Sequence, residues 1–406
     1  MRNLIVCLIL LPVAGCMSPP DSDDGAGDSL KIHAGESPSG PRLSTGAAGT
    51  VVLSWMEPDV SGTTLWYSQL IEDGWQPSRT VVSGVDMFVN WADLPSVTAL
   101  TETHWVAHWL EMAGESTYAY HVVISQSFDR GRTWSKPIKP HTDDTPTEHG
   151  FVSLFPQDGK VAAIWLDGRK TGNEPSGDPT TSGMTLRGAV IDNDGSLHDE
   201  QLIDELICDC CQTDVAVAES GPVAVYRNRT SDEVRDIFVT RNIDGVWAPG
   251  VSLNNDNWQI AGCPVNGPAI AARGNQVAAA WFSLPGQEPA VRVKFSADGG
   301  ASFGPVIPVA REGSLGRVDT VLLPDGSAIT SWLQSSESGL GDLLVRHVTL
   351  EGRMSTVHKI ASNAPARSVP QMSLSGSDLV FVWTEMAGET TGIASARVPV
   401  AAITMN

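Results

Sequence analysis

The sequence predicts an all-β fold, a β-propeller of four-stranded antiparallel blades, from a repeat that runs along the whole chain. Seven short apolar runs end in an aromatic residue followed two positions later by a polar side chain; the aromatics are Trp55, Trp109, Trp165, Tyr226, Trp281, Trp332 and Trp383. They lie 51 to 61 residues apart, and a period near 50 residues indicates a radial repeat such as a propeller. No stretch has a convincing helical period, and 39 Gly and 26 Pro among 406 residues suit many tight turns.

Each unit begins with a shorter alternating stretch that we interpret as the innermost strand of a blade. These stretches start at Pro41, Pro95, Gly150, Thr213, Gly267, Asp319 and Pro370, and each starts 13 to 15 residues before its aromatic. That interval fits two strands of about five residues joined by a tight turn. Downstream segments such as 64–81 and 236–253 have the pattern of a second hairpin, so each unit supplies four strands.

The repeat predicts seven blades, with six as the alternative if the cysteine-rich fourth unit is irregular. The last unit supplies only three strands before the chain ends, and an extra strand-like segment, 29–34, precedes the first unit. We expect this N-terminal strand to complete the last blade and close the ring, because closure removes an exposed sheet edge. Two β-sandwiches would not repeat one strand–turn–strand unit at a fixed interval.

The N-terminus has the form of an export signal. Arg2 is followed by an apolar run to Val13, too short to span a bilayer, and then by small residues before Cys16. The segment LPVAGC resembles the lipobox of bacterial lipoproteins, which implies that residues 1–15 are a lipoprotein signal peptide and that Cys16 carries the lipid. An ordinary cleaved signal peptide is the alternative.

The same resemblance implies that the mature protein is anchored in the bacterial cell envelope. Met17 after the lipidated cysteine favours the outer membrane, with the domain in the periplasm or at the cell surface. Residues 16–28 are expected to form a flexible acidic tether, and residues 29–406 a single β-propeller domain. The lipid anchor would be the only contact with the membrane.

The charge balance excludes two classes of partner. The formal net charge is −21 and is spread along the chain, so neither nucleic acid nor an anionic membrane surface is expected to bind. Among the basic residues 19 are Arg and 7 are Lys, and arginine suits planar, bidentate capture of carboxylates or phosphates. An arginine bias can also be simply genomic.

Two turns carry a resemblance to a family. Residues 127–134 (SFDRGRTW) match closely, and residues 296–303 (SADGGASF) match more loosely, the Asp-box pattern S-x-D-x-G-x-T-W of sialidases and related propellers. The chain thus resembles the Asp-box sialidase-like superfamily, which implies a glycan or glycoconjugate ligand at the channel mouth. In that family the turn is structural and lies on the face away from the ligand site. Asp129 and Asp298 are therefore expected to hold turns.

The aligned repeat predicts which side chains meet at the channel mouth, since the innermost strand starts there and the second strand returns there. The returning strands deliver Glu57, Glu111, Asp167, Asn228, Ser283, Gln334 and Glu385, with Arg169, Arg227 and Arg229 just beyond. The entering ends deliver Arg42, Asp93, His149, Cys211, Asn266, Arg317 and Arg367. The predicted ligand-binding residues are Arg42, His149, Asp167, Arg169, Arg227, Arg229, Asn266, Arg317 and Arg367. The alternative is a mouth that is polar because it is wet, with charges that neutralise one another.

Whether the protein is an enzyme stays open at this level. The resemblance implies three arginines that clamp a substrate carboxylate, a tyrosine–glutamate pair as nucleophile and an aspartate as acid/base. Arg42 has the place of the first arginine, although the family's Ile-Pro after it is missing. The other two could come from Arg229 or Arg235 and from Arg317 or Arg367.

The nucleophile is the weak point of this comparison. The family's tyrosine comes late in the chain, and no tyrosine follows Tyr226 in this sequence. A divergent sialidase-like glycoside hydrolase could instead use two carboxylates, Asp93 with Asp167 or Glu111, because a suitably spaced pair suffices for glycoside hydrolysis. We keep that hydrolase as the alternative to a glycan-binding propeller.

Four cysteines are the most individual feature of the chain. Cys208, Cys210 and Cys211 (CDCC) and Cys263 enter the innermost strands of adjacent units, so their thiols should meet between the fourth and fifth blades. In an oxidising envelope we expect disulfides, with one of the trio joined to Cys263 as a staple between blades. The alternative is a thiolate site for copper or zinc, aided by His149, in a metal-binding or scaffolding propeller. Otherwise no cofactor is expected.

Overall fold

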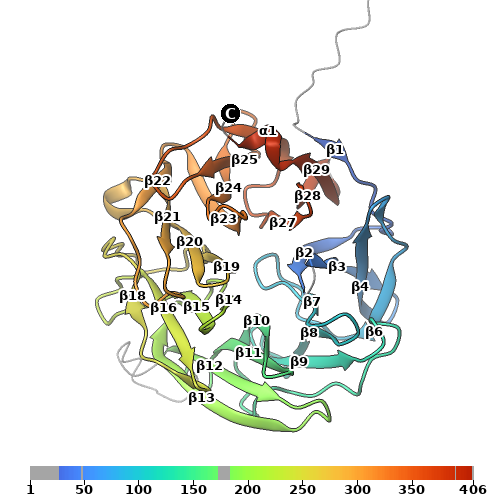
Figure 1. The fold of residues 1–406 in the computed structure, drawn as a ribbon. Helices are drawn as coiled ribbons and strands as arrows, with labels where there is room; N and C mark the ends of the chain where they lie inside the picture. Colours follow the sequence, from blue (N-terminus) through green and yellow to red (C-terminus); the bar gives the residue numbers. More distant parts are fainter. Residues whose placement is uncertain (1–26, 47–48, 172–182, 389, 405–406) are drawn as a thin grey trace, which may run out of the picture.

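The computed structural model describes residues 27–46, 49–171, 183–388 and 390–404, and these form a ring of seven small antiparallel sheets (Figure 1). The predicted all-β, seven-bladed propeller is therefore confirmed. The expected signal peptide, the lipidation site Cys16 and nearly all of the tether lie outside the described residues. Within the described part of the chain, no helix is long and apolar enough to cross a membrane.

The first three blades follow one another in chain order. Blade 1 consists of β2 (Ser39–Thr45), β3 (Val51–Asp59), β4 (Gly62–Ile71) and β6 (Arg79–Val85), with β5 (Gly74–Trp75) at a turn. Blade 2 consists of β7 (Ser96–Ala99), β8 (Trp105–Met112) and β9 (Tyr120–Ser127). Blade 3 consists of β10 (His149–Gln157), β11 (Lys160–Asp167), β12 (Met184–Ile191) and β13 (Leu197–Ile207).

The remaining four blades complete the circle. Blade 4 consists of β14 (Asp214–Ala218), β15 (Gly221–Arg227), β16 (Ile237–Ile243), β17 (Val246–Trp247) and β18 (Val251–Ser252). Blade 5 consists of β19 (Ala269–Arg273), β20 (Gln276–Ser283), β21 (Ala290–Ser296) and β22 (Ile307–Ala310). Blade 6 consists of β23 (Ser314–Leu322), β24 (Ala328–Ser335), β25 (Gly341–Val348) and β26 (His358–Ala364). Blade 7 consists of β27 (Gln371–Ser375), β28 (Asp378–Ala387), β29 (Thr390–Pro399) and β1 (Asp28–Ser29), and is followed by the short helix α1 (Val400–Ile403).

The N-terminal strand closes the ring, as the sequence predicted. Strand β1 pairs with β29 of the last blade, and the Leu30 N–H donates to the Ser395 carbonyl at 2.8 Å. The paired part is shorter than the predicted segment 29–34. Beyond it, the side chains of Leu30, Ile32 and Ala34 pack against the hydrophobic core between blades 1 and 7, which takes the chain out of the sheet.

Blade 2 differs from the predicted four strands. Its sheet has three strands, and the segment 128–148, which follows β9, meets the sheet only at isolated positions such as the bridge between Ile138 and Ile124. Pro137 and Pro140 flank Ile138, and a proline has no N–H to donate to a β-ladder. The rest of this segment must therefore be held by other contacts.

The repeat aromatics form the buried centres of the blades and explain the polar residue that follows them. In blades 1 to 3 the indole N–H donates to the carboxylate two residues later, at 2.7–2.9 Å: Trp55 to Glu57, Trp109 to Glu111 and Trp165 to Asp167. In blades 4, 5 and 7 the aromatic donates to another side chain that also bonds the residue two positions later: Tyr226 to Asp204, Trp281 to Asp256 and Trp383 to Asn363. A buried indole N–H needs such an acceptor, so the polar residue of the repeat is structural.

The turns at 127–134 and 296–303 close in the same way. Asp129 accepts the Thr133 N–H at 2.8 Å and the Thr133 hydroxyl at 2.7 Å, and Asp298 accepts the N–H and hydroxyl of Ser302 at 2.9 and 2.6 Å. The hydrogen bonds from Thr133 lower the pKa of Asp129 to about 2. Both aspartates hold their turns together, in the role expected from the resemblance.

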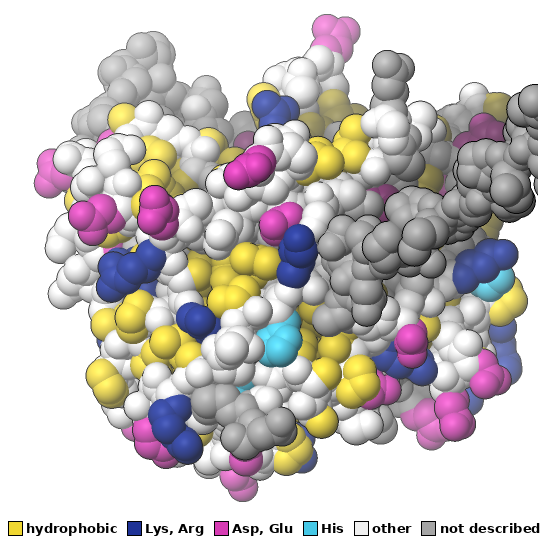
Figure 2. Space-filling view, turned by 90° about the horizontal axis from the view of Figure 1, so that it is seen from above, with side chains coloured by type: hydrophobic (Ala, Val, Ile, Leu, Met, Phe, Trp, Pro, Cys, Tyr) yellow, Lys and Arg dark blue, Asp and Glu magenta, His cyan; other side chains and the backbone are white. Residues whose placement is uncertain are grey.

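The surface carries its charge in small, mixed groups. One side of the ring shows acidic and basic side chains intermingled with hydrophobic ones (Figure 2). On that side the net charge of −21 is not gathered into one patch. Such a surface favours solubility and gives no single direction for electrostatic steering.

Candidate functional site

The innermost strands surround a central channel with a cavity of about 880 Å³. β-bulges interrupt three of these strands where they start at the mouth, between Ser39 and Arg42, Gly150 and Ser153, and Gly316 and Asp319. Within the last two bulges Phe151 and Arg317 have positive φ angles of 52° and 56°. Bulges re-aim side chains, and a bulky residue at positive φ costs free energy, so both features gather at functional sites. The mouth is therefore the first candidate site.

The connection between blades 1 and 2 crosses this mouth. Residues 86–95 link β6 of blade 1 to β7 of blade 2, and we call them the mouth segment. The Ala92 carbonyl accepts a hydrogen bond of 2.8 Å from Gln212, just before β14 of blade 4. The Trp91 ring lies with its centroid 4.9 Å from the guanidinium carbon of Arg317 on blade 6. The mouth segment thus places a partly exposed indole beside an arginine from a distant blade.

Arg317 is fixed by its backbone but lacks partners for part of its side chain. Its N–H donates to Asn266 Oδ1 at 2.8 Å, and the Asn266 amide donates in turn to the Leu315 carbonyl at 3.2 Å. The guanidinium Nε and Nη1 are buried without a hydrogen-bond partner. Burial lowers the pKa of Arg317 to about 10, so the group stays charged at neutral pH. A buried cation with unpaired donors is costly, and an anionic ligand would remove that cost.

Arg42 has a different environment within the same channel. Burial lowers the pKa of Arg42, and the charges of Asp214, Asp93 and Asp319 oppose that effect. Burial also raises the pKa of Asp319 to about 7, although its carboxylate accepts the Met372 N–H at 2.7 Å. Arg42 therefore already has acidic neighbours, and Arg317 is less compensated than Arg42.

A tyrosine joins two carboxyl groups beside the mouth. The Tyr120 hydroxyl lies 2.7 Å from Glu148 Oε1 and 3.3 Å from Asp93 Oδ2, and Asp93 Oδ1 accepts the Phe151 N–H at 2.8 Å. Burial raises the pKa of Asp93 and of Glu148 to about 7 in each case. Tyr120 is fully buried and stacks on Phe88 with ring centroids 4.0 Å apart. Tyr120 and Glu148 were not among the predicted site residues.

Several predicted ligand-binding residues are engaged elsewhere. Arg227 is buried and donates to the carbonyls of Asn266, Arg235 and Phe282, so it ties blades 4 and 5 together. This corrects its expected role, because its donors are used within the fold. Arg169 pairs with Asp167 at 2.7 Å and with Glu200 at 2.9 Å. Arg229 pairs with Glu233 at 2.6 Å and Asp209 at 3.2 Å.

The remaining predicted residues lie in different parts of the fold. Asn266 positions Arg317 as described above, and Arg367 lies exposed before β27. Glu111 and Asp167, two of the catalytic candidates, accept the indole N–H bonds of the repeat. Asp167 is fully buried, and Asp93, the third candidate, is 2% exposed. The pairing of Asp93 with Asp167 or Glu111 is therefore replaced by the contact of Asp93 with Tyr120.

The cysteines form one bond between blades. Cys210 and Cys263 are joined by a disulfide with a Cα–Cα distance of 6.0 Å. Cys208 and Cys211 are buried free thiols, which differs from the expectation of a fully oxidised set. Arg235 donates to the Cys208 sulfur at 3.5 Å, and burial raises the pKa of Cys208 well above its ordinary value. A guanidinium beside these thiols disfavours the alternative of a cation at the CDCC segment.

Three histidines meet at the rim between blades 2 and 3. They are His121 at the start of β9, His141 in the segment 128–148, and His149 at the start of β10, and their ring centroids lie 4.3 to 5.2 Å apart. Asp143 lies 2.9 Å and Asp167 3.7 Å from His149 Nε2. The sequence drew attention to His149 alone, because His121 and His141 occupy no repeat position.

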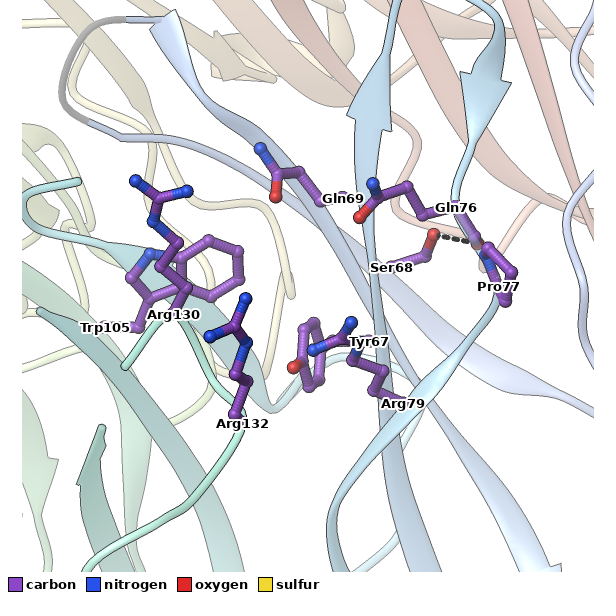
Figure 3. Close-up of a pocket in the computed structure, with 9 residues that line it drawn as sticks. All are labelled: Tyr67, Ser68, Gln69, Gln76, Pro77, Arg79, Trp105, Arg130 and Arg132. Atoms are coloured by element: carbon purple, nitrogen blue, oxygen red, sulfur yellow. Dashed lines mark hydrogen bonds between the residues drawn. The ribbon is translucent and has the colours of Figure 1, made fainter. Parts of the chain in front are cut away.

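A second, smaller pocket lies near the turn at residues 127–134, after β9 of blade 2. Its cavity of about 140 Å³ is lined by Tyr67, Ser68, Gln69, Gln76, Pro77, Arg79, Trp105, Arg130 and Arg132 (Figure 3). Arg130 pairs with Glu102, and the Tyr67 hydroxyl donates to the Gly131 carbonyl at 2.8 Å. The three arginines are exposed to solvent. This pocket is therefore less suited to enclosing a ligand than the channel mouth.

Comparisons with known proteins agree at the level of fold. No protein-family model matches the chain, and no curated protein matches its sequence. Similar solved structures include the NanB sialidase of Streptococcus pneumoniae (9% identity, 93% of this chain and 94% of that chain, TM-score 0.48) and an α-L-arabinofuranosidase of Fusarium graminearum (11%, 94% and 98%, TM-score 0.50). A puromycin hydrolase is similar over 91% of this chain and 53% of its own (14%, TM-score 0.52). The chain has a β-propeller fold that is similar to those of the arabinofuranosidase and the puromycin hydrolase.

Proposed function

We propose that this protein is a glycan-binding propeller that takes an acidic sugar or glycoconjugate at its channel mouth. The observation that carries the proposal is Arg317, whose buried guanidinium has two unpaired nitrogens and lies against the ring of Trp91. A sugar carboxylate would accept hydrogen bonds from these nitrogens, and charge-assisted bonds of this kind are among the strongest in proteins. The partly exposed indole offers an apolar face for the sugar ring beside them.

The environment of Arg317 favours a small anion over a large polyanion. The channel cavity is enclosed by seven innermost strands, and the mouth segment crosses its opening. Asp93, Asp214 and Asp319 place acidic groups around the nearby Arg42, which disfavours a ligand with many negative charges. A single carboxylate on an otherwise neutral sugar fits one uncompensated guanidinium.

The preference for a glycan is supported by the Asp-box resemblance. The arabinofuranosidase of similar fold was solved with an iminosugar inhibitor, so this type of propeller accommodates sugar-like ligands in that protein. Fold alone does not determine function, and the proposal therefore depends on the chemistry of the mouth. We propose further that Cys16 is lipidated and holds the domain at the bacterial cell envelope through the acidic tether.

A divergent glycoside hydrolase is the second candidate, and the contact of Tyr120 with Glu148 and Asp93 is the observation that favours it. These are the three residue types that the resemblance implies for a sialidase. The hydrogen bonds of Tyr120 and its stacking on Phe88 argue against it, because the hydroxyl is already engaged with Glu148 and Asp93. Turnover of fluorogenic sialosides or arabinosides, lost in Tyr120→Phe, would establish the hydrolase.

Calorimetric titration with acidic and matched neutral oligosaccharides, chosen from a glycan array, tests the binding function. We expect an acidic sugar to bind, and Arg317→Ala to weaken binding at least about 30-fold, since a charge-assisted pair contributes roughly 2 kcal/mol or more. Arg353→Ala removes an exposed arginine that is paired with Glu351, and should leave the affinity unchanged. Equal binding of acidic and neutral sugars, or unchanged affinity in Arg317→Ala, would remove the proposed site.

A further inference from the structure

The histidine cluster at the rim between blades 2 and 3 is not used by the proposed glycan site. Donor atoms of His121, His141 and His149 all lie within 4.8 Å of one another, and so do those of Asp143, His149 and Asp167. His149 is fully buried and His141 is 2% exposed. A neutral imidazole has one nitrogen that accepts, and a buried acceptor normally has a partner, so unpaired nitrogens in this cluster need an explanation.

Two of these imidazoles have a nitrogen without a partner inside the cluster. His121 Nδ1 and His141 Nε2 are both buried and form no hydrogen bond. The other nitrogen of His141, Nδ1, lies 2.9 Å from the Asp143 carbonyl, which can only accept. Nδ1 of His141 must therefore carry the hydrogen, and Nε2 presents a lone pair. A backbone carbonyl that fixes the tautomer in this way is the usual support of a metal-ligating histidine.

His149 differs from His141, because both of its ring nitrogens face oxygen atoms. Its Nδ1 lies 3.0 Å from the Thr147 carbonyl and 3.3 Å from the Tyr120 carbonyl, so Nδ1 is the donor. In a neutral ring Nε2 then has no hydrogen, yet it lies 2.9 Å from Asp143 Oδ2 and 3.7 Å from Asp167 Oδ2. The contact with Asp143 is satisfied either by a hydrogen on Nε2, as in a hydrogen bond, or by a metal cation that lies between the nitrogen and the oxygen.

We infer that this rim binds one divalent transition-metal ion, with zinc as its natural occupant. The ligands are His121 Nδ1, His141 Nε2, His149 Nε2 and the Asp143 carboxylate, and three imidazoles with one carboxylate form a donor set that suits zinc in tetrahedral geometry. Zinc holds nitrogen ligands at about 2.0–2.1 Å, which places neighbouring donor atoms roughly 3.4 Å apart. The observed separations need only small side-chain movements to reach that value.

Asp167 lies next to the proposed ligand His149 and is not itself a ligand. It accepts the Trp165 indole N–H at 2.9 Å and two hydrogen bonds of 2.7 Å from Arg169, so its oxygens are already in use. It lies near His149 without being free to serve as a full ligand. Its negative charge still favours a cation at the rim, and it holds the end of β11 beside His149.

An ion at this position would stabilise the connection between blades 2 and 3. Blade 2 lacks a fourth strand, and the segment 128–148 that replaces it has few backbone bonds to the sheet. A metal ion would link this segment to both blades. Its ligands would be His141 and Asp143 of the segment, His121 of blade 2 and His149 of blade 3. The ion is thus a structural one, and its role does not depend on the glycan proposal.

Zinc chloride titrated into the chelator-treated, full-length protein tests this inference by calorimetry and by thermal unfolding. We expect one ion per chain, a rise in Tm on binding, and a loss of affinity of at least about 100-fold in His141→Ala and in His121→Ala. His198→Ala is the matched control, since this exposed histidine pairs with Asp192 at 2.7 Å outside the cluster. The double variant Cys208→Ser, Cys211→Ser should bind zinc as the wild type does.

Anomalous scattering at the zinc edge from crystals of the wild-type protein gives a second readout that requires no variant. An ion within bonding distance of His121, His141 and His149 would establish the site even if the variants fail to fold. Zinc binding that persists in both histidine variants, an ion located at the cysteines, or the absence of an ion in zinc-soaked crystals would overturn the inference.

Discussion

Arg317 of blade 6 lies 4.9 Å above the ring of Trp91, a residue that reaches it from the connection between blades 1 and 2. The two residues are 226 positions apart in the sequence (317 minus 91) and belong to blades that are not neighbours in the ring. Their contact is therefore a product of the closed ring and of the mouth segment that crosses it. It also places the poorly compensated guanidinium of Arg317 beside a partly exposed aromatic ring, which the proposed function assigns to a sugar.

Trp91→Ala should weaken the binding of an acidic sugar without unfolding the domain. The indole is 37% exposed, so its removal costs little core packing, while a cation–π contact of this kind contributes about 1–2 kcal/mol. We expect an affinity about tenfold lower by calorimetry, since that ratio corresponds to about 1.4 kcal/mol. Phe128→Ala removes a similarly exposed ring in the turn at residues 127–134 and should have no effect on affinity. An unchanged affinity in Trp91→Ala would exclude the ring from the site.

Gly316→Ala should disturb the site by displacing Arg317. Gly316 has a φ of 81°, and an added Cβ would lie 2.2 Å from the Asn266 oxygen that holds the Arg317 N–H. We expect the free energy of unfolding to fall by about 1–3 kcal/mol and ligand binding to be lost. Gly339→Ala is the control, because Gly339 has nearly the same φ, 80°, but open space around it. Equal effects of the two changes in urea unfolding would show that only backbone strain matters.

The repeat and the fold could be predicted because every blade satisfies the same two requirements. Each blade needs a large buried aromatic, and its buried N–H or O–H needs an acceptor, so a polar residue follows Trp109 and its counterparts at a fixed interval. The prediction failed at the same residues when they were assigned to the mouth. Glu111 and Asp167 lie near the end of a returning strand, yet their oxygens point to the indoles of their own blades.

The site could be predicted only where the repeat reaches it. Arg317 and Asn266 begin innermost strands, and the sequence places them at the mouth for that reason. Trp91, Tyr120 and His141 occupy no repeated position, and their contacts depend on how connections of different length fold back over the ring. Arg227 was misassigned because its partners are backbone carbonyls from two blades, which no sequence pattern reveals.

Asp93 should make the stability of the protein depend on pH in a defined direction. Its pKa is about 7 in the folded protein and about 3.9 in an unfolded chain, so the folded state binds the proton more tightly. This stabilising contribution is complete below about pH 4 and is lost as the pH rises through about 7. Asp93→Asn keeps an acceptor for the Phe151 N–H and cannot ionise. Its free energy of unfolding should therefore fall less between pH 5 and pH 8 than that of the wild type.

The difference between the two pH profiles should be on the order of 2 kcal/mol, because each unit of pKa shift corresponds to about 1.4 kcal/mol. Urea unfolding at four or five pH values measures it. Asp232→Asn, at an exposed turn, serves as the control and should reproduce the wild-type profile. Parallel profiles for wild type and Asp93→Asn would mean that Asp93 does not hold its proton in the folded state.

Loss of the disulfide between Cys210 and Cys263 should lower the free energy of unfolding, because the unfolded chain then gains conformational entropy. The disulfide links residues 53 positions apart, and closing a loop of that length removes conformational entropy worth up to about 4 kcal/mol from the unfolded state. Cys263→Ser should therefore unfold at a lower urea concentration, and reductant should bring the wild type to the same midpoint. Cys208→Ser changes a free thiol and should keep its sensitivity to reductant. If reductant leaves the wild-type midpoint unchanged, the bond does not stabilise the connection between blades 4 and 5, which the other contacts between these blades then hold.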